Sequence, residues 1–266
     1  MILEPVSESD IDSLRELQPD GWPDIVPNFK IYTSSSFCFP VKAKLDDIIA
    51  GVGAVIKFGN TGWLAHIIVR PEHRNKGIGG AIVDHLVNNM KAEGCESVSL
   101  IATELGYPVY KRFGFVDQED YIFFERREPL KNQRLPGNII PYSINHAEKI
   151  FSLDRAVSGE KRFELLVDRL ETAFVFERGG NVAGFYIPDL GEGLIIANDA
   201  EAGIELMKAR LSNTNKSVLP VCNEKATEFL RANGFVEIKR AKRMILGKKF
   251  EWQPAKFFNR AGGNVG

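Results

Sequence analysis

Three glycines and the cations Arg74 and Lys76 stand between an apolar run and an amphipathic segment in "VRPEHRNKGIGGAIVDHL", residues 69–86. The β-branched run at 66–69 predicts a buried strand, which must end before Pro71 because proline cannot donate a hydrogen bond to a sheet. Helical spacing of apolar residues follows, at Ile78, Ile82, Leu86 and Met90. A helix is therefore expected to begin at the glycines.

The start of this helix has the features of an anion site. Its first backbone N–H groups have no partner inside the helix and carry the positive end of the helix dipole. Gly77, Gly79 and Gly80 lack Cβ atoms, so a ligand can approach the main chain closely. Such a terminus suits phosphate best. A glycine-rich turn that only joins a strand to a helix has the same features, and this alternative stays open at this point.

Three phosphate-binding patterns can be compared with this loop. The chain has no GxxxxGK[ST] run, and "GIGGAI" places Ile82 where a dinucleotide fingerprint has its third glycine. Arg74, Gly77 and Gly79 fill the pattern [QR]-x-x-G-x-[GA], and the chain here resembles the GNAT superfamily of acyl-CoA-dependent N-acetyltransferases. The segment "LIATELGYPVYKRFGF", residues 100–115, also resembles a GNAT strand, a short helix and a Gly-Phe ending. Two linked motifs at the correct separation strengthen the resemblance.

The resemblance implies that acetyl-CoA is the cosubstrate and that its pyrophosphate lies on the glycine loop. A backbone N–H among residues 68–70, with Val69 favoured, would stabilise the negative charge on the thioester oxygen. The residues expected to bind the cofactor are Ile67, Ile68, Val69, Arg74, Asn75, Lys76, Gly77, Ile78, Gly79, Gly80, Thr103 and Tyr110.

Two residues are candidates for proton transfer. Tyr110 occupies the position of the GNAT tyrosine that protonates the leaving thiolate, and packing on a short amphipathic helix is its alternative role. His66 and Ala65 stand where many GNAT enzymes carry a carboxylate base. His66 is either the base, acting directly or through water, or a strand histidine bonded to a backbone carbonyl. Trp22 and Trp63 either line an acceptor pocket or lie in the core.

Composition limits the class of protein. The chain has 266 residues, of which 44% are hydrophobic and 26% charged, and its net charge of −1 gives no reason to expect nucleic acid or an anionic membrane as a partner. No apolar run approaches the roughly 20 residues of a membrane span. The N-terminus lacks the features of a signal peptide, and three cysteines without a CxxC spacing indicate reduced thiols in a cytoplasm. The four histidines show no metal-ligand spacing, so no metal is expected.

The predicted fold is α/β, with a mostly antiparallel mixed sheet flanked by helices in each of two GNAT-like domains. Residues 1–127 form the first domain: a strand at 1–5, a helix from Ser7, a hairpin turning at Asp46 and Asp47, and then the strand, loop and helix described above. Residues 128–138 are polar, contain two prolines and read as a linker.

Residues 139–266 are expected to repeat this order of elements, and a dissimilar α/β domain with a chance Gly-Phe is the alternative. "VAG" at 182–184 is similar to "IAG" at 49–51, and "NEKATEFLRANGF" at 223–235 resembles a second GNAT ending, with Leu230 at the tyrosine position. The second copy has "ANDAEAG" where the first has its glycine loop, and Asp199 and Glu201 there would repel a pyrophosphate. We expect a degenerate domain that shares in the acceptor pocket, with the aromatic tail "FEWQPAKFFNRAGG" docked on it.

The sequence thus predicts an enzyme that transfers an acetyl group from acetyl-CoA to a primary amine, with a small molecule as the acceptor. A non-catalytic acyl-CoA sensor is the alternative: Tyr110 favours the enzyme, and the missing carboxylate at 65–66 favours the sensor. The sequence predicts neither the identity of the acceptor nor the oligomeric state.

Overall fold

The computed structural model describes residues 1–131 and 137–266, in two compact units. Unit 1 comprises Met1–Asp117, Met244–Lys249 and Gly263–Val265; unit 2 comprises Gln118–Arg243, Phe250–Gly262 and Gly266. Part of the expected linker, residues 132–136, lies outside the described residues. The domain boundaries at 127 and 139 stay a prediction. The compact units divide the chain differently, since unit 2 begins at Gln118 and unit 1 takes in two late segments.

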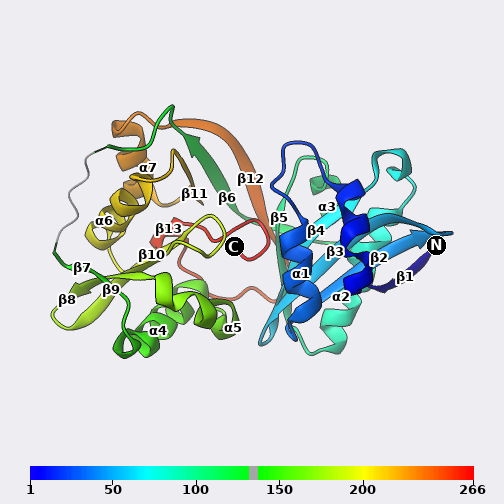
Figure 1. Cartoon of the computed structure of the whole chain (residues 1–266), viewed down its shortest axis with the longest axis horizontal. Helices are drawn as coiled ribbons and strands as arrows, with labels where there is room; N and C mark the ends of the chain where they lie inside the picture. Colours follow the sequence, from blue (N-terminus) through cyan, green and yellow to red (C-terminus); the bar gives the residue numbers. More distant parts are fainter. Residues whose placement is uncertain (132–136) are drawn as a thin grey trace. The chain divides into compact units, whose positions relative to one another are not determined.

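Unit 1 is a sheet with helices on both faces (Figure 1). Its strands are β1 (Ile2–Pro5), β2 (Cys38–Leu45), β3 (Ile48–Phe58), β4 (Thr61–Val69) and β5 (Ser97–Ala102), in that order across the sheet. The pairs are antiparallel except for the parallel pair β4–β5. Its helices are the 3₁₀ segments η1 (Glu8–Leu17) and η2 (Pro71–His73), and α1 (Val26–Ser34), α2 (Ile78–Ala92) and α3 (Tyr107–Arg112).

Local sequence explains most of these boundaries. Ser7 and Asp10 form a capping box at the start of η1, although the helix expected there is a 3₁₀ helix. Asp46 has a φ of 52° at the turn between β2 and β3, a left-handed conformation that aspartate tolerates. The hairpin expected around Asp46 and Asp47 is therefore present.

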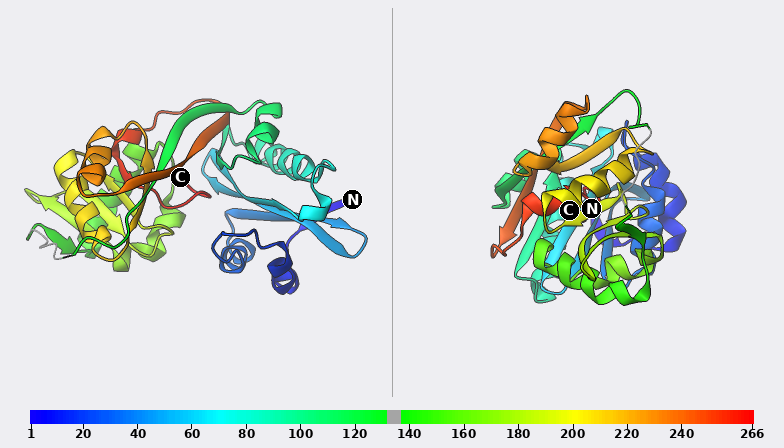
Figure 2. Two further views of the ribbon diagram at one scale, coloured as in Figure 1. Left: turned by 90° about the horizontal axis from the view of Figure 1, so that it is seen from above. Right: turned by 90° about the vertical axis from the view of Figure 1, so that its left-hand side faces the viewer.

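Two glycines in β3 bring α2 close to the sheet. A Cβ atom at Gly51 would lie 2.9 Å from the Ile68 carbonyl oxygen, and one at Gly53 would lie 2.6 Å from Ile67 Cδ1. Because these positions are bare, Ile82 of α2 packs directly over β3. Figure 2 shows α2 on one face of this sheet, and η1 and α1 on the other. The start of α2 is thereby fixed beside the end of β4.

Unit 2 contains most of β6 (Val116–Glu125) and the following elements. Its strands are β7 (Ile139–Pro141), β8 (Phe174–Arg178), β9 (Asn181–Ile187), β10 (Leu194–Ala197), β11 (Lys216–Pro220), the first part of β12 (Val236–Gly247), and β13 (Phe257–Asn259). Its α-helices are α4 (Ala147–Ser158), α5 (Phe163–Leu166), α6 (Ala200–Leu211) and α7 (Glu224–Ala232). Its 3₁₀ segments are η3 (Ile144–His146), η4 (Val167–Thr172) and η5 (Pro254–Lys256).

The strands that follow the two Gly-Phe sequences are exchanged between the copies. β6 follows Gly114 and Phe115 of the first copy, yet it pairs antiparallel with β11 of the second. The end of β12, which follows Gly234 and Phe235, lies beside β5, where the Lys248 N–H donates to the Glu96 carbonyl at 2.9 Å. A five-stranded sheet, β13-β10-β9-β8-β7, completes unit 2.

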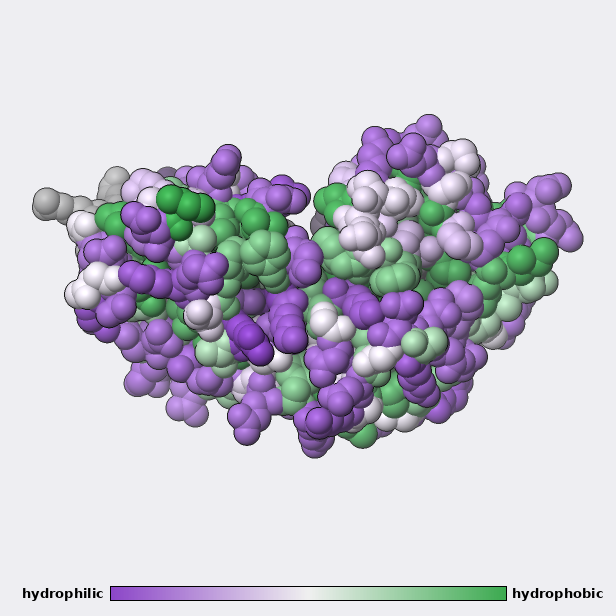
Figure 3. Space-filling model, turned by 90° about the horizontal axis from the view of Figure 1, so that it is seen from below, coloured by the Kyte–Doolittle hydropathy of each residue, from purple (hydrophilic) through white to green (hydrophobic). Residues whose placement is uncertain are grey.

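The molecular surface carries both polar and apolar residues. Figure 3 shows one face on which polar residues surround separate apolar patches. Among residues 1–131 and 137–266, no helix is long and apolar enough to cross a membrane. The same residues contain no group of three or more His, Cys, Asp or Glu side chains that could hold a metal ion.

Gly203 in α6 provides a test of the packing in unit 2, because a Cβ atom there would overlap the Phe258 ring. Gly203→Ala should lower the free energy of unfolding by about 1–3 kcal/mol, the usual range for overpacking. Gly80→Ala in α2 is the matched control, since its Cβ would lie 3.7 Å from the nearest atom, on Phe113. Urea unfolding followed by circular dichroism compares the two variants. Equal stability of Gly203→Ala and wild type would contradict this packing.

Candidate functional site

The strands β4 and β5 separate part-way along β4. Their pairing covers only Thr61–Trp63 of β4, opposite residues 97–99 of β5, whereas β4 continues to Val69. On its other edge, β4 stays paired with β3 as far as Val69, and the next N–H, that of Arg70, donates to the Ala50 carbonyl at 2.9 Å. Successive N–H groups of a strand face opposite edges, so the Val69 N–H faces the gap left by β5.

The glycine loop follows this gap directly. Left-handed conformations at Asn75, with φ of 59°, and Gly77, with φ of 84°, turn the chain into α2. The Arg74 side chain lies back along the loop, and its Nε donates to the Val69 carbonyl at 3.1 Å. The Arg74 main-chain N–H is already bonded to the Pro71 carbonyl at 3.3 Å, so it is not one of the N–H groups offered to a ligand. Asn75 and Lys76 are exposed.

Packing inside the protein does not explain the glycines at 79 and 80. A Cβ at Gly79 would lie 3.5 Å from Val69 Cγ2, and one at Gly80 would lie 3.7 Å from Phe113, both ordinary contacts. Gly77 is required by its backbone conformation. The bare main chain at Gly79 and Gly80 therefore fits a ligand that comes close to the start of α2, which an alanine would hold away.

Tyr110 lies in the core cluster of unit 1 together with Ile78, the first residue of α2. Burial raises the pKa of its phenol, which therefore keeps its proton at neutral pH. Gly106 makes room for the ring, because a Cβ there would lie 2.8 Å from Tyr110 Cε2. Thr103, exposed just after β5, uses its hydroxyl to accept a hydrogen bond from the Gly106 N–H at 3.1 Å.

His66 occupies a β-bulge. Between the pairs Ala54–Ala65 and Val52–Ile68, β4 has one residue more than β3, and His66 has a φ of 49°. A bulge with a left-handed residue turns a side chain away from the regular alternation of a strand. Ile67 and Ile68 follow the bulge on the stretch of β4 that β5 leaves unpaired, where Ile68 is buried and Ile67 packs against the core.

The partner of His66 is a phenol rather than a backbone carbonyl. Its Nδ1 lies 2.9 Å from the hydroxyl of Tyr32 in α1, and that hydroxyl accepts a hydrogen bond from Asn264 Nδ2 at 2.8 Å. Phe29 and Trp22 contact the imidazole edge-on, with ring centroids 5.9 and 6.2 Å away. Burial lowers the pKa of His66 to about 4, so the ring is neutral at pH 7.

Sequence reasoning missed Tyr32, Phe29 and Asn264, because no local motif connects them to His66. The two tryptophans considered for an acceptor pocket, Trp22 and Trp63, have different positions. Trp63 is fully buried in the core, whereas Trp22 is 39% exposed and contacts His66. Only Trp22 is therefore placed to line a site.

The corresponding helix start in unit 2 is occupied by side chains. Asp199 caps α6 by accepting a hydrogen bond from the Ala202 N–H at 3.0 Å. Arg178 of β8 bridges Asp199 and Glu201, at 2.7 Å to each. Hydrogen bonding to Arg178 lowers the pKa of Asp199, so the carboxylate is charged at neutral pH. Negative charge thus stands where unit 1 has glycines.

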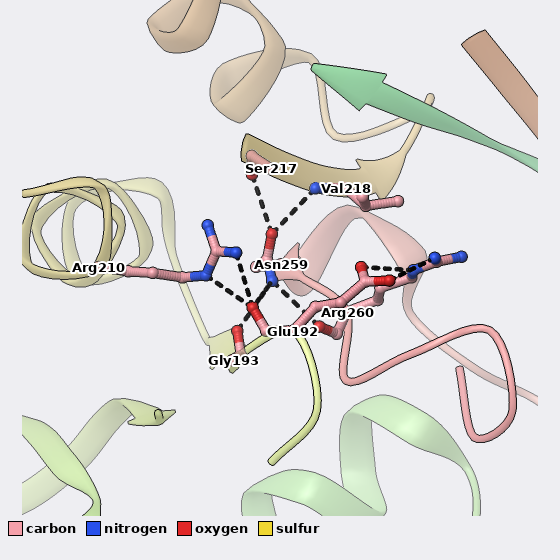
Figure 4. A network of polar contacts seen from close by, with 7 residues as sticks. All are labelled: Glu192, Gly193, Arg210, Ser217, Val218, Asn259 and Arg260. Carbon is pink, nitrogen blue, oxygen red and sulfur yellow. Dashed lines mark hydrogen bonds and ion pairs between the residues drawn. The ribbon is translucent and has the colours of Figure 1, made fainter. Parts of the chain in front are cut away.

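The strand β13 fills the space between β10 and β11 in unit 2. It pairs with β10, and on its other side the Arg260 N–H donates to the Val218 carbonyl at 2.9 Å. Figure 4 shows the Asn259 side chain between Val218 of β11 and Gly193, the residue before β10. Its Oδ1 accepts from the Val218 N–H at 2.9 Å, while Nδ2 donates to the Gly193 carbonyl at 2.9 Å. The chain's own peptide thereby uses the groups that an open gap would present.

A cavity of about 360 Å³ lies beside β13, at the starts of α6 and α7. Asp199, Glu224 and Lys256 are among the residues that line it. It contains neither a glycine loop nor a free strand edge like that of Val69, so we place the candidate site in unit 1.

Comparisons with known proteins give a match to the first part of the chain and another to the second part. The acetyltransferase (GNAT) family model matches residues 3–115, and a GNAT acetyltransferase domain model matches residues 150–258. No curated protein matched the sequence.

Two solved structures share the fold over almost the whole chain. A proposed acetyltransferase from Pyrococcus horikoshii is 20% identical, with a TM-score of 0.84 over 100% of this chain and 95% of that one. A GCN5-related N-acetyltransferase from Sphaerobacter thermophilus is 13% identical, with a TM-score of 0.63 over 95% of this chain and 98% of that one. From the two family matches and the tandem fold, we conclude that this chain belongs to the GNAT acetyltransferase family and carries two of its domains, one after the other.

Proposed function

We propose that the protein transfers the acetyl group of acetyl-CoA to a primary amine of a small molecule, at a single site in unit 1. Membership of the GNAT family implies acyl transfer from an acyl-CoA. The observation that carries the proposal is the gap beside Val69 next to a helix start whose glycines no internal packing requires. This arrangement offers N–H groups both to a thioester and to a pyrophosphate.

The reaction assigns a task to each group. The amine nitrogen releases a proton to solvent water and forms a bond to the thioester carbon, and the C–S bond then breaks. The Val69 N–H stabilises the negative charge that develops on the carbonyl oxygen. Tyr110 gives its proton to the leaving thiolate, for which a phenol that keeps its proton at neutral pH is suited. The residues assigned to the cofactor are residues 67–69 of β4, residues 74–80 of the loop and the start of α2, Thr103 after β5, and Tyr110 of α3.

Unit 2 supports a count of one acyl-CoA per chain. Carboxylates stand at the start of α6, and β13 occupies the space between β10 and β11. A second acyl-CoA would need both places. We therefore assign unit 2 no cofactor.

Release of free thiol from acetyl-CoA across a panel of primary amines tests the function. An enzyme should release thiol with at least one amine and give the N-acetylated product in equal amount by mass spectrometry. Binding of acetyl-CoA without turnover on any amine would overturn the enzyme and favour the sensor alternative. That alternative is supported by the absence of a carboxylate at residues 65–66.

Gly79→Asp should abolish most acetyl-CoA binding, because the carboxylate blocks the approach to the helix start and repels the pyrophosphate. Calorimetry should give one site per wild-type chain and severely reduced affinity in the variant. Gly79→Ala adds a side chain without charge, and so separates the effect of size on binding from the effect of charge. Ala200→Asp places the same charge in the first turn of α6 and should not alter acetyl-CoA binding. Two sites per chain, or normal affinity in folded Gly79→Asp, would contradict the placement.

Tyr110→Phe should lower kcat by about 10²–10⁴-fold, the usual contribution of a general acid, with little change in acetyl-CoA affinity. Tyr107→Phe on the same helix is the matched control, since its hydroxyl donates to the Asp117 carboxylate at 3.1 Å instead. Single-turnover kinetics isolates the chemical step from product release. An unchanged single-turnover rate in Tyr110→Phe would return Tyr110 to a packing role.

A further inference from the structure

A chain of hydrogen bonds links three distant parts of the sequence within unit 1. Asn264 Nδ2 lies 2.8 Å from the Tyr32 hydroxyl, and that hydroxyl lies 2.9 Å from His66 Nδ1. Tyr32 is 3% exposed, so its hydroxyl has little water to bond. The uncharged rings of Phe29 and Trp22 also lie against the imidazole.

The donors and acceptors available to each group fix the direction of these hydrogen bonds. An amide Nδ2 can only donate, so Asn264 uses one lone pair of the Tyr32 oxygen. The phenol proton then has His66 Nδ1 as its acceptor. If Nδ1 carried a proton instead, it would donate to Tyr32 and leave the buried phenol proton without an acceptor, which is costly. The ring proton of neutral His66 is therefore on Nε2.

We propose that Asn264 and Tyr32 are positioning residues that hold His66 as its Nε2–H tautomer, so that His66 offers the acceptor molecule a hydrogen-bond donor and not a base. The inference rests on the proposed function for its kinetic part only. A donor at this place fits an acceptor that carries an oxygen next to its reacting amine, such as an α-amino acid amide. The bulge at His66, with its φ of 49°, turns the ring toward Tyr32 and the aromatic rings.

The tautomer can be measured without any turnover. Long-range ¹H–¹⁵N spectra of protein labelled with ¹⁵N-histidine resolve the four histidines, and His66→Gln assigns the signal of His66. We expect a proton on Nε2 alone in the wild type. Tyr32→Phe should give a mixture of tautomers and a higher pKa for His66, because the neutral ring loses the hydrogen bond that stabilises it.

Asn264→Ala should also mix the tautomers, since water in the space left by the amide can accept the phenol proton and Tyr32 can then accept from Nδ1. Tyr142→Phe is the control: Tyr142 contacts His146 edge-on in unit 2, and His146 Nδ1 accepts from the Ser143 N–H at 3.0 Å. This control should leave the His66 signals unchanged. A proton on Nδ1 in the wild type, or a wild-type spectrum in Tyr32→Phe, would overturn the proposal whether or not the protein is an enzyme.

Kinetics with α-amino acid amides then separates a donor from a base. The glutamine of His66→Gln retains an N–H donor but cannot accept a proton at neutral pH, so kcat should fall less than tenfold. His66→Ala should raise KM for the amide and leave KM for acetyl-CoA unchanged. A general base would instead cost about 10²–10⁴-fold in both variants, and that result overturns the donor role. Residue 66 has a left-handed backbone, so a substitution there could destabilise the fold. Thermal melts check that both variants are folded.

Discussion

The early end of the pairing between β4 and β5 is the constraint on which the candidate site depends. After Trp63 the two strands separate, and β4 continues with only β3 as a neighbour. The backbone groups left on its free edge need partners, since a buried N–H without one costs about 1–3 kcal/mol. A substrate amide or thioester can supply them. The glycine loop follows this edge directly, between Val69 and the start of α2.

Unit 2 shows what happens when the chain itself supplies those partners. There β13 lies between β10 and β11, and the amide of Asn259 bonds the Val218 N–H as a neighbouring strand would. The absence of a glycine loop at the start of α6 and the filling of the gap therefore belong together. Once the chain's own peptide has closed the gap, carboxylates at the start of α6 have no bound cofactor to repel. Asp199 there stabilises the helix as its N-terminal cap.

Sequence predicted the parts of the molecule that depend on neighbouring residues. The loop at 74–80, the hairpin at Asp46 and the start of α2 are each encoded within a few residues, and all are present. The exchange of β6 and β12 was missed, because the choice of a strand's partner is decided by contacts far apart along the chain. The bulge at His66 was missed for a related reason: an extra residue in one strand shows only against its partner.

The side chains that surround His66 could not be predicted from its neighbours in the sequence. Asn264 is 232 residues from Tyr32 along the chain, and it belongs to unit 1 only because the segment 263–265 returns there. A histidine with a carboxylate partner would be held ready to accept a proton. With the tautomer proposed for His66, Nδ1 already accepts a phenol proton and is not so held, and burial among aromatic rings weakens the imidazole further as a base. The chemistry available to a residue on β4 is thus set by the opposite end of the sequence.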